Sequence, residues 1–453
     1  MKKYDLIVLG GGSAGMSMVF PAAEKEWNTA ILDSGNLGGT CVNTGCIPSK
    51  TLISSARAMQ SVRDVHHYGV IAEPPQADWK AMVERKNQLV EKLRRQIYEG
   101  IEANKNITLY EGKATFTGSQ TVEIDGEFLT AEKIVIATGA RSAIPPVDGL
   151  NHIEYLTSTS AMEITELPDS LLILGGGLIA LEFAQLFVRL GVEVTIIQRS
   201  SRLAPNLEPE ISDKIRSILE SEGINVKTNT SISSAESEKD SVYLVDETES
   251  GPKRYRADKI LVSTGRAPNS DVLGLEKAGV ETDKRGYIAV DENFKTSSEG
   301  VWAIGDVIGG MMFTHKAWHD GLLLSRHLVK GEAIVSSNRV IPAAVFTEPE
   351  IASVGMGEAA AIKEGYEIKI QKLPFSSHGR ALAMGKLQGF VKLVLDKSSG
   401  RILGGHIIGP EAGELIHELV TAVSFGATVY DLQEMIHVHP TLSEAINKTA
   451  WAE

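Results

Sequence analysis

A short apolar run at residues 6–9 opens the chain and ends in a glycine-rich turn. An apolar helical stretch follows, and a second apolar run at residues 30–32 ends at Asp33. Strand, glycine turn, helix and strand in this order predict a dinucleotide-binding unit, because the glycines let a pyrophosphate approach the amides of the helix start. Asp33 is then placed to hold a ribose hydroxyl. The candidate contacts in the turn are Gly10, Gly12, Ser13, Ala14 and Gly15.

The same pattern recurs in the middle of the chain. Residues 171–174 form an apolar run, a helix is expected to begin around Ile179, and residues 192–197 form the next apolar run. This repetition predicts a second dinucleotide site. Its candidate contacts are Gly175, Gly177, Leu178 and Ile179.

The ribose-binding position differs between the two units. Gln198 occupies in the second unit the place that Asp33 has in the first, and Arg199 and Arg202 follow it. Because the arginine fork matches a phosphate and no carboxylate repels one here, we predict NADPH rather than NADH. The alternative is that the two arginines lie on a solvated surface after a strand.

Two further apolar runs, at residues 133–140 and 259–266, contain Thr-Gly near their ends, and each is expected to close one nucleotide unit. The second unit would then be an insertion within the first. We therefore expect an α/β fold with two Rossmann-like dinucleotide-binding domains, the second inserted in the first. Candidate cofactor contacts at the ends of these runs are Thr138, Gly139 and Gly265.

Composition narrows the function. With 453 residues, of which 43% are hydrophobic and 23% charged, the chain is expected to form several packed units. Its net charge of −13 repels phosphate backbones and anionic lipid, so no nucleic-acid or membrane partner is expected. No run approaches the roughly 20 apolar residues of a membrane span, and a cytoplasmic location is expected.

The two cysteines of the sequence, Cys41 and Cys46, lie in the segment GGTCVNTGCIPSK shortly after Asp33. In an ideal helix such a pair is separated by about 7.5 Å in rise, which exceeds the reach of a disulfide. We therefore expect a local distortion, favoured by Gly45 and Pro48, and a helix start that lowers a thiol pKa. Two sulfurs supply half of a zinc site, so redox exchange is favoured and no metal is expected.

This segment closely resembles the redox-active segment of the class I pyridine nucleotide-disulfide oxidoreductases. The resemblance covers essentially the whole chain, through both glycine turns and the C-terminal stretch 437–444. It implies FAD in the first unit and NADPH or NADH in the second. The implied organisation is an FAD-binding domain with a first part at 1–144 and a central part at 267–337, an NAD(P)-binding domain at 145–266, and a C-terminal α+β dimerisation domain at 338–453.

Roles of single residues follow from this resemblance by position. Cys46 is expected to lie nearest the flavin as a thiolate, and Cys41 to exchange with substrate. Lys50 is expected beside the flavin and paired with Glu182, and Asp306 is expected to hold the ribityl chain. The other implied flavin contacts are Gly39, Thr40, Gly112, Ala114 and the stretch from Met312 to His315.

The segment HVHPTLSE matches the motif that carries the acid/base of this family. His439 is expected to shuttle the proton of the leaving thiol, and Glu444 to orient its ring. In this family the base comes from the other subunit, so the resemblance implies a homodimer with shared active sites. A set of apolar residues at helical spacing is expected either at that interface or in a helix buried within the chain. The set is Leu415, Leu419, Val420 and Val423.

Among members of the family, the resemblance is strongest to lipoamide dehydrogenase. It predicts exchange with a small dithiol or disulfide, or with a lipoyl group on a partner protein. The Gln198 position leaves open a glutathione reductase-like, NADPH-driven reduction of a small disulfide. A mercuric reductase-like activity is less favoured because no C-terminal cysteine pair is present. A non-catalytic flavoprotein scaffold is disfavoured because the cysteines, His439 and Glu444 are intact. The physiological substrate and the direction of electron flow stay open.

Overall fold

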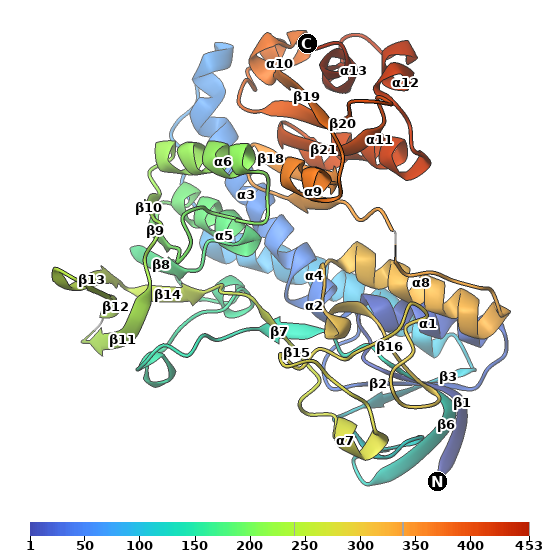
Figure 1. Cartoon of the computed structure of the whole chain (residues 1–453). Coiled ribbons are helices and arrows are strands. Elements are labelled where there is room, and N and C mark those ends of the chain that lie inside the picture. The colour runs from blue at the N-terminus through green and yellow to red at the C-terminus, as the bar shows by residue number, and fades with distance from the viewer. Residues whose placement is uncertain (240, 338, 453) are drawn as a thin grey trace.

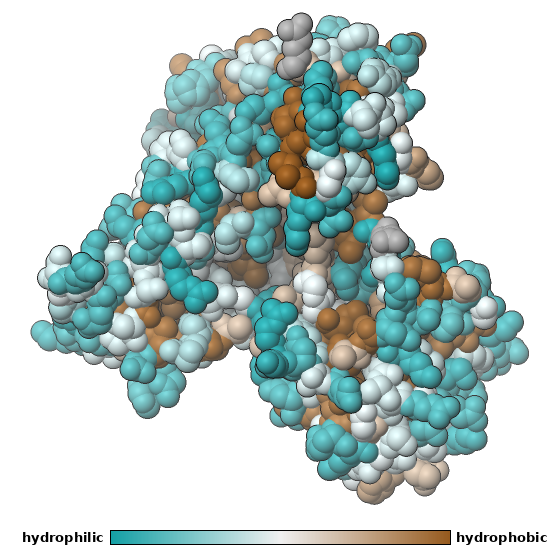
Figure 2. Space-filling model, in the orientation of Figure 1, coloured by the Kyte–Doolittle hydropathy of each residue, from teal (hydrophilic) through white to brown (hydrophobic). Residues whose placement is uncertain are grey.

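The computed structural model describes residues 1–239, 241–337 and 339–452. Figure 1 shows three lobes: one carries the N-terminus, one consists of the middle of the chain, and one carries the C-terminus. Figure 2 shows the surface hollowed between the lobes. The mixed α/β fold class predicted from the sequence is confirmed. None of the helices in the described ranges is long and apolar enough to cross a membrane.

The N-terminal lobe is built on a sheet in the order β3-β2-β1-β6-β5-β4, with β16 paired to β6. Strands β1, β2, β3, β6 and β16 run parallel, and β4 and β5 form antiparallel pairs. Strand β1 is buried at every position in its second half, as expected of a parallel strand covered on both faces. The strands are β1 (Lys2–Leu9), β2 (Thr29–Asp33), β3 (Ile107–Glu111), β4 (Ala114–Gly118), β5 (Thr121–Ile124), β6 (Glu127–Ile136) and β16 (Val301–Ala303).

Helices α1 and α8 pack together on this lobe, although almost 300 residues separate them in the sequence. The chain passes to the middle lobe through β7 and returns through β15, and these two strands pair antiparallel. The helices and the two connecting strands in this part of the chain are α1 (Ser13–Glu24), α2 (Gly39–Asn43), α3 (Cys46–Asp64), α4 (Trp79–Glu102), α7 (Leu275–Ala278), α8 (Thr314–Lys330), β7 (Ala140–Ser142) and β15 (Arg266–Pro268).

The middle lobe repeats the strand-helix-strand unit. Its parallel sheet has the order β10-β9-β8-β14, and a separate antiparallel sheet has the order β11-β12-β13. The predicted strands at 171–174 and 192–197 and the helix near Ile179 are confirmed. The elements are β8 (Ser170–Leu174), α5 (Leu178–Arg189), β9 (Glu193–Ile197), α6 (Pro209–Ser221), β10 (Asn225–Lys227), β11 (Ile232–Glu238), β12 (Ser241–Thr248), β13 (Gly251–Ala257) and β14 (Lys259–Val262).

The C-terminal lobe is an antiparallel sheet in the order β17-β18-β21-β20-β19, covered by helices. Helix α11 packs on β18 and β21. The lobe consists of β17 (Ala343–Val345), β18 (Glu350–Gly355), α9 (Glu358–Lys363), β19 (Ile368–Pro374), α10 (Gly379–Ala383), β20 (Phe390–Asp396), β21 (Ile402–Gly409), α11 (Ala412–Phe425), α12 (Val429–Glu434) and α13 (Glu444–Ala450).

The apolar residues of α11 that the sequence places at helical spacing form part of the hydrophobic core of this lobe. Leu415 and Leu419 are buried in its hydrophobic cluster, and Val420 and Val423 pack against that cluster. Of the two alternatives that the sequence leaves open, the helix buried within the chain is therefore the one observed for these residues.

A buried ionic cluster joins the middle and C-terminal lobes. The side chain of Lys392, on β20, is fully buried, and its Nζ lies 2.7 Å from Oε2 of Glu208, at the start of α6. Glu358, at the start of α9, is a further partner of Lys392. The carboxylates raise the pKa of Lys392 against the opposing effect of its burial. The amine therefore holds carboxylates of two lobes in one place.

Replacing Lys392 with methionine should destabilise the protein strongly, because it leaves carboxylates without their buried cation. Losing one partner of a buried pair costs about 3–5 kcal/mol. Thermal unfolding should show a clearly lower midpoint. The matched control is Lys397→Met, which removes an amine from an exposed pair with Glu367 and should change the midpoint little. Equal midpoints for the two variants would contradict this role of the cluster.

Candidate active site

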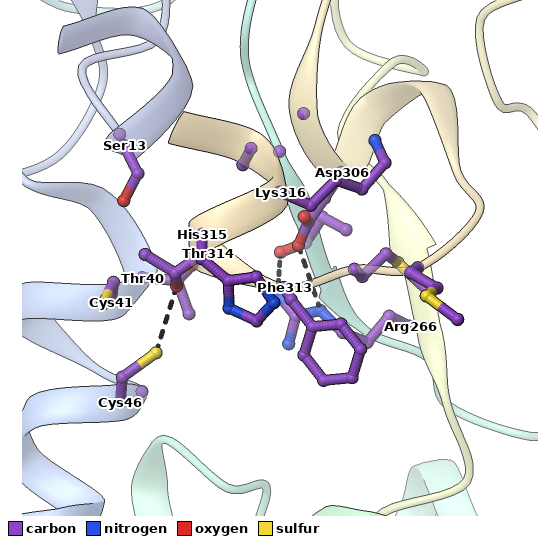
Figure 3. Close-up of a pocket in the computed structure, with 18 of the residues that line it drawn as sticks. Ser13, Thr40, Cys41, Cys46, Arg266, Asp306, Phe313, Thr314, His315 and Lys316 are labelled. Carbon is purple, nitrogen blue, oxygen red and sulfur yellow. Dashed lines mark hydrogen bonds and ion pairs between the residues drawn. The ribbon is translucent and has the colours of Figure 1, made fainter. Parts of the chain in front are cut away.

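A cavity of about 1850 Å³ runs between the three lobes and contains both cysteines. Its walls come from the first glycine turn, α2, the starts of α3, α5 and α8, and the strand β18. Figure 3 shows the part of the cavity where α3 and α8 begin. The starts of several helices therefore meet around one space, which favours groups that carry negative charge.

The two cysteines do not share one helix. Cys41 lies in the short helix α2, which ends at Asn43, and Cys46 is the first residue of α3. Gly45 lies at the break, where a side chain would come within 2.9 Å of the Thr40 carbonyl oxygen. The distortion expected from the spacing is therefore a complete break between two helices. Both cysteines are free thiols in the described structure.

The pKa values of the two thiols are shifted in opposite directions. The hydrogen bond from the Cys41 thiol lowers the pKa of Cys46 to about 6, with help from Thr314 and the charge of Lys50 and against the effect of burial. The pKa of Cys41 is raised, because the same hydrogen bond keeps its proton and burial disfavours its anion. At neutral pH the pair thus holds one thiolate on Cys46 and one thiol on Cys41.

Lys50 follows Cys46 by about one helical turn, and its Nζ lies 2.8 Å from Oε2 of Glu182 on α5. Glu182 Oε1 also accepts a hydrogen bond from the backbone amide of Phe346, at 2.9 Å, in the segment after β17. The Lys50 ammonium lies 4.8 Å from the centre of the Phe346 ring. The Glu182 carboxylate of the middle lobe therefore connects α3, which carries Cys46 and Lys50, to the C-terminal lobe.

The two glycine turns have the same local geometry. Asp33 Oδ2 accepts a hydrogen bond from the amide of Gly11 at 2.5 Å, and Gln198 Oε1 accepts one from the amide of Gly176 at 3.0 Å. Gln198 therefore replaces the acid without losing the hydrogen bond that shapes the turn. Arg199 is exposed, whereas the guanidinium of Arg202 is paired with Asp213 on α6 at 3.0 Å.

Asp306 lies in the cavity wall, in the short helical turn that follows β16, and Figure 3 shows its side chain. Burial raises the pKa of its carboxyl group, and the charges of Arg266 and Lys316 oppose this rise. Asp306 is half-buried, and a carboxylate of this kind that faces a cavity is suited to accept hydrogen bonds from the hydroxyls of a ligand. The glycine turn at one end of the cavity and this carboxylate in its wall together fit the FAD that the resemblance implies.

Most predicted cofactor contacts line this cavity. They are Gly10, Gly12, Ser13, Ala14, Asp33, Gly39, Thr40, Lys50, Gly112, Ala114, Thr138, Gly139, Gly177, Leu178, Ile179, Gly265, Asp306, Met312 and His315. Five others are not among its lining residues: Gly15, Gly175, Gln198, Arg199 and Arg202. Gly15 instead packs against the carbonyl of Gly10, where any side chain would collide.

Two side-chain contacts near Cys46 and Asp306 were not predicted from the sequence. Thr314 Oγ1 lies 3.2 Å from Cys46 Sγ, and Arg266 Nε lies 4.0 Å from Asp306 Oδ2. Thr314 lies within the expected flavin-contact stretch, but no local pattern indicates that its hydroxyl meets a sulfur 268 positions away.

The C-terminal pair is held together but lies apart from the cysteines. His439 Nδ1 is 2.9 Å from Glu444 Oε1, and the amide of Thr441 donates to Glu444 Oε2 at 2.9 Å. These contacts lower the pKa of Glu444 to about 2, so its carboxylate accepts the Nδ1 proton throughout the neutral range. The His439 side chain is 74% exposed, and neither residue lines the cavity that contains the cysteines of the same chain.

The low pKa of Cys46 predicts a pH-dependent spectrum. In the reduced protein loaded with FAD, a thiolate beside the flavin should give long-wavelength absorbance at pH 8. The band should fade as the pH falls through about 6, because the sulfur then takes up a proton. Cys46→Ser is the control and should lack the band at every pH. A band that persists unchanged at pH 4 or never forms would contradict the assignment.

Two family models match the chain. Residues 4–321 match the model of the pyridine nucleotide-disulphide oxidoreductases, and residues 341–450 match the dimerisation domain of that family. The second match assigns the C-terminal lobe to a dimerisation domain.

Relatives and solved structures agree with these matches. A dihydrolipoyl dehydrogenase of Thermus scotoductus is 38% identical over 456 residues, which cover 100% of this chain and 98% of that protein. A mercuric reductase of Bacillus cereus is 37% identical over 444 residues, which cover 98% of this chain and 70% of that protein. The HOCl-induced flavoprotein disulfide reductase RclA of Escherichia coli has a TM-score of 0.90 at 29% identity, with 99% of each chain covered. The chain belongs to the class I pyridine nucleotide-disulfide oxidoreductase family and is an FAD-dependent oxidoreductase.

Proposed function

We propose that this enzyme transfers electrons between NADPH and a dithiol or disulfide substrate of the dihydrolipoamide type through Cys41 and Cys46. The observation that carries the proposal is that Cys41 and Cys46 both line the cofactor cavity, with Cys46 at the start of α3. The raised pKa of Cys41 and the lowered pKa of Cys46 agree with it. FAD, when bound, supplies the two-electron exchange between the nicotinamide and the cysteine pair. The chain itself supplies the sulfur chemistry and the proton transfers.

The exchange with substrate needs a nucleophilic sulfur and a proton carrier. In the reductive direction Cys41 loses its proton, attacks one substrate sulfur and forms a mixed disulfide, while the other substrate sulfur leaves as a thiol. The Cys46 thiolate then attacks the Cys41 sulfur, which forms the Cys41–Cys46 disulfide and expels the second substrate sulfur as a thiolate that takes up a proton from solvent. Because the pKa of Cys41 is raised, the first step requires a base.

His439 is the base that we assign to this step. Its Nδ1 is held by Glu444, so its Nε2 remains available to take the Cys41 proton and pass it to the leaving sulfur. Within one chain the pair does not line the cysteine cavity. We therefore assign the proton transfer to His439 of the partner subunit in a homodimer.

Apolar side chains exposed near this histidine support the homodimer. Ile436 is 100% exposed, Val438 77% and Phe425 85%. Phe425 ends α11, and Ile436 and Val438 lie in the segment that leads to His439. Exposed apolar residues of this size are typical of an interface that a partner covers. The matched dimerisation domain agrees with this assignment.

A mixing experiment tests the shared site. Neither Cys41→Ser nor His439→Gln homodimers should turn over substrate appreciably. After unfolding and refolding an equal mixture, the mixed dimers should contain one intact site each, so activity should return to about a quarter of the wild-type value. Refolded wild-type protein is the control. No recovery, with mixed dimers shown to be present, would mean that both residues act within one chain.

NADPH preference is a further part of the proposal. Arg199 is exposed and follows Gln198 directly, so it is the better candidate for a 2′-phosphate than Arg202, which Asp213 already pairs. Arg199→Ala should lower kcat/KM for NADPH by about tenfold or more and leave NADH unaffected, because a charge-assisted hydrogen bond is lost. Arg216→Ala, which removes an arginine from an exposed pair on α6, is the control. A wild-type preference for NADH would contradict this part.

The substrate class needs a direct assay. Turnover of dihydrolipoamide, lipoamide, glutathione disulfide and small synthetic disulfides should be measured with both nicotinamide cofactors. Lipoyl substrates should give the highest kcat/KM. A higher value for glutathione disulfide would instead support the second candidate, an NADPH-dependent reductase of small disulfides, which the amide at Gln198 favours.

A further inference from the structure

Thr314 meets the reactive sulfur from the opposite wall of the cavity. It is the first residue of α8, and its Oγ1 lies 3.2 Å from Cys46 Sγ, the contact drawn as a dashed line in Figure 3. The hydroxyl can donate to only one acceptor at a time. A thiolate is a much stronger acceptor than a thiol or a disulfide sulfur.

The two residues in contact are also the first residues of two long helices. Cys46 begins α3, which has 19 residues, and Thr314 begins α8, which has 17 residues. Each helix start carries a partial positive charge, so both favour an anion at this sulfur. The contact between Thr314 and Cys46 therefore lies where the two helix starts already favour a negative charge.

We propose that Thr314 stabilises the thiolate of Cys46 through its hydroxyl hydrogen bond and thereby favours the reduced form of the cysteine pair. This inference rests on the proposed function, because it assumes that the pair cycles between a disulfide and an open form. It assigns Thr314 a role in the redox chemistry in addition to lining the cavity.

The balance of the redox step shows why the hydroxyl acts on one state. When the disulfide takes up two electrons, the S–S bond breaks, Cys41 binds one proton and Cys46 keeps the negative charge. The hydrogen bond from Thr314 gains strength only when that charge appears. Removing it should therefore make the disulfide harder to reduce.

The other groups that act on Cys46 are accounted for. The Cys41 thiol and the Lys50 ammonium lower its pKa in the same sense as Thr314, and burial opposes them. Glu182 is paired with Lys50 and fixes the position of that ammonium. Lys50 and Glu182 remain when Thr314 is changed, and the Cys41 side chain is the same in every protein that is compared, so the effect of the hydroxyl can be measured separately.

The test is made in flavin-loaded protein that carries Cys41→Ser, in which Cys46 is a single titrating sulfur. Adding Thr314→Val should raise the apparent pKa of the long-wavelength thiolate band by about one unit, which is a tenfold loss of ionisation. Adding Thr314→Ser should keep the value of the parent, since serine retains the donor. Adding Thr51→Val is the matched control, because its hydroxyl donates to the Ile47 carbonyl oxygen in α3 and not to the sulfur.

A second readout uses both native cysteines. Equilibration of the Thr314→Val protein with a thiol-disulfide buffer should show a midpoint potential lower by about 30 mV, which is a tenfold change converted for two electrons. An unchanged band pKa in Thr314→Val, or the same shift in Thr314→Ser, would overturn the inference while leaving the proposed function intact. A parent protein without any thiolate band would contradict the proposed function, and the inference would fall with it.

Discussion

The start of helix α3 at Cys46 is the constraint on which the rest of the site depends. Because the chain breaks between α2 and α3, Cys46 occupies the positive end of a helix instead of its interior. The same break places Cys41 where its thiol can donate to the Cys46 sulfur. The backbone geometry therefore gives two identical side chains different pKa values. Cys46 is a stable thiolate, whereas Cys41 needs a base to lose its proton.

Contacts between the lobes position the groups that surround the sulfur of Cys46. Glu182 of the middle lobe holds Lys50 of the cysteine helix with one carboxylate and also accepts the amide of Phe346 in the C-terminal part of the chain. The buried cluster around Lys392 joins the middle and C-terminal lobes at a second point. Paired charges between the lobes thus fix the relative positions of the two nucleotide units and the dimerisation domain. If the lobes separate, these charges lose their partners and the stabilisation that the partners supply.

Features that depend on local chain geometry could be predicted from the sequence. The two glycine turns, their flanking strands and the break near Gly45 all follow from short-range patterns, and the structure contains them. Features that depend on packing could not. Leu415 and Leu419 have a spacing that fits an interface as well as a core, and only the sheet beneath α11 decides between them. The contact of Thr314 with Cys46 joins two helix starts that no periodicity relates.

The proposed function requires that Cys41 and Cys46 store an electron pair beside the flavin. Anaerobic titration of the flavin-loaded protein with dithionite measures this capacity directly. The wild-type protein should consume about twice as much reductant per flavin as Cys46→Ser and should form the long-wavelength band before the flavin absorbance is lost. Equal consumption by the two proteins, with no intermediate band in either, would contradict the account.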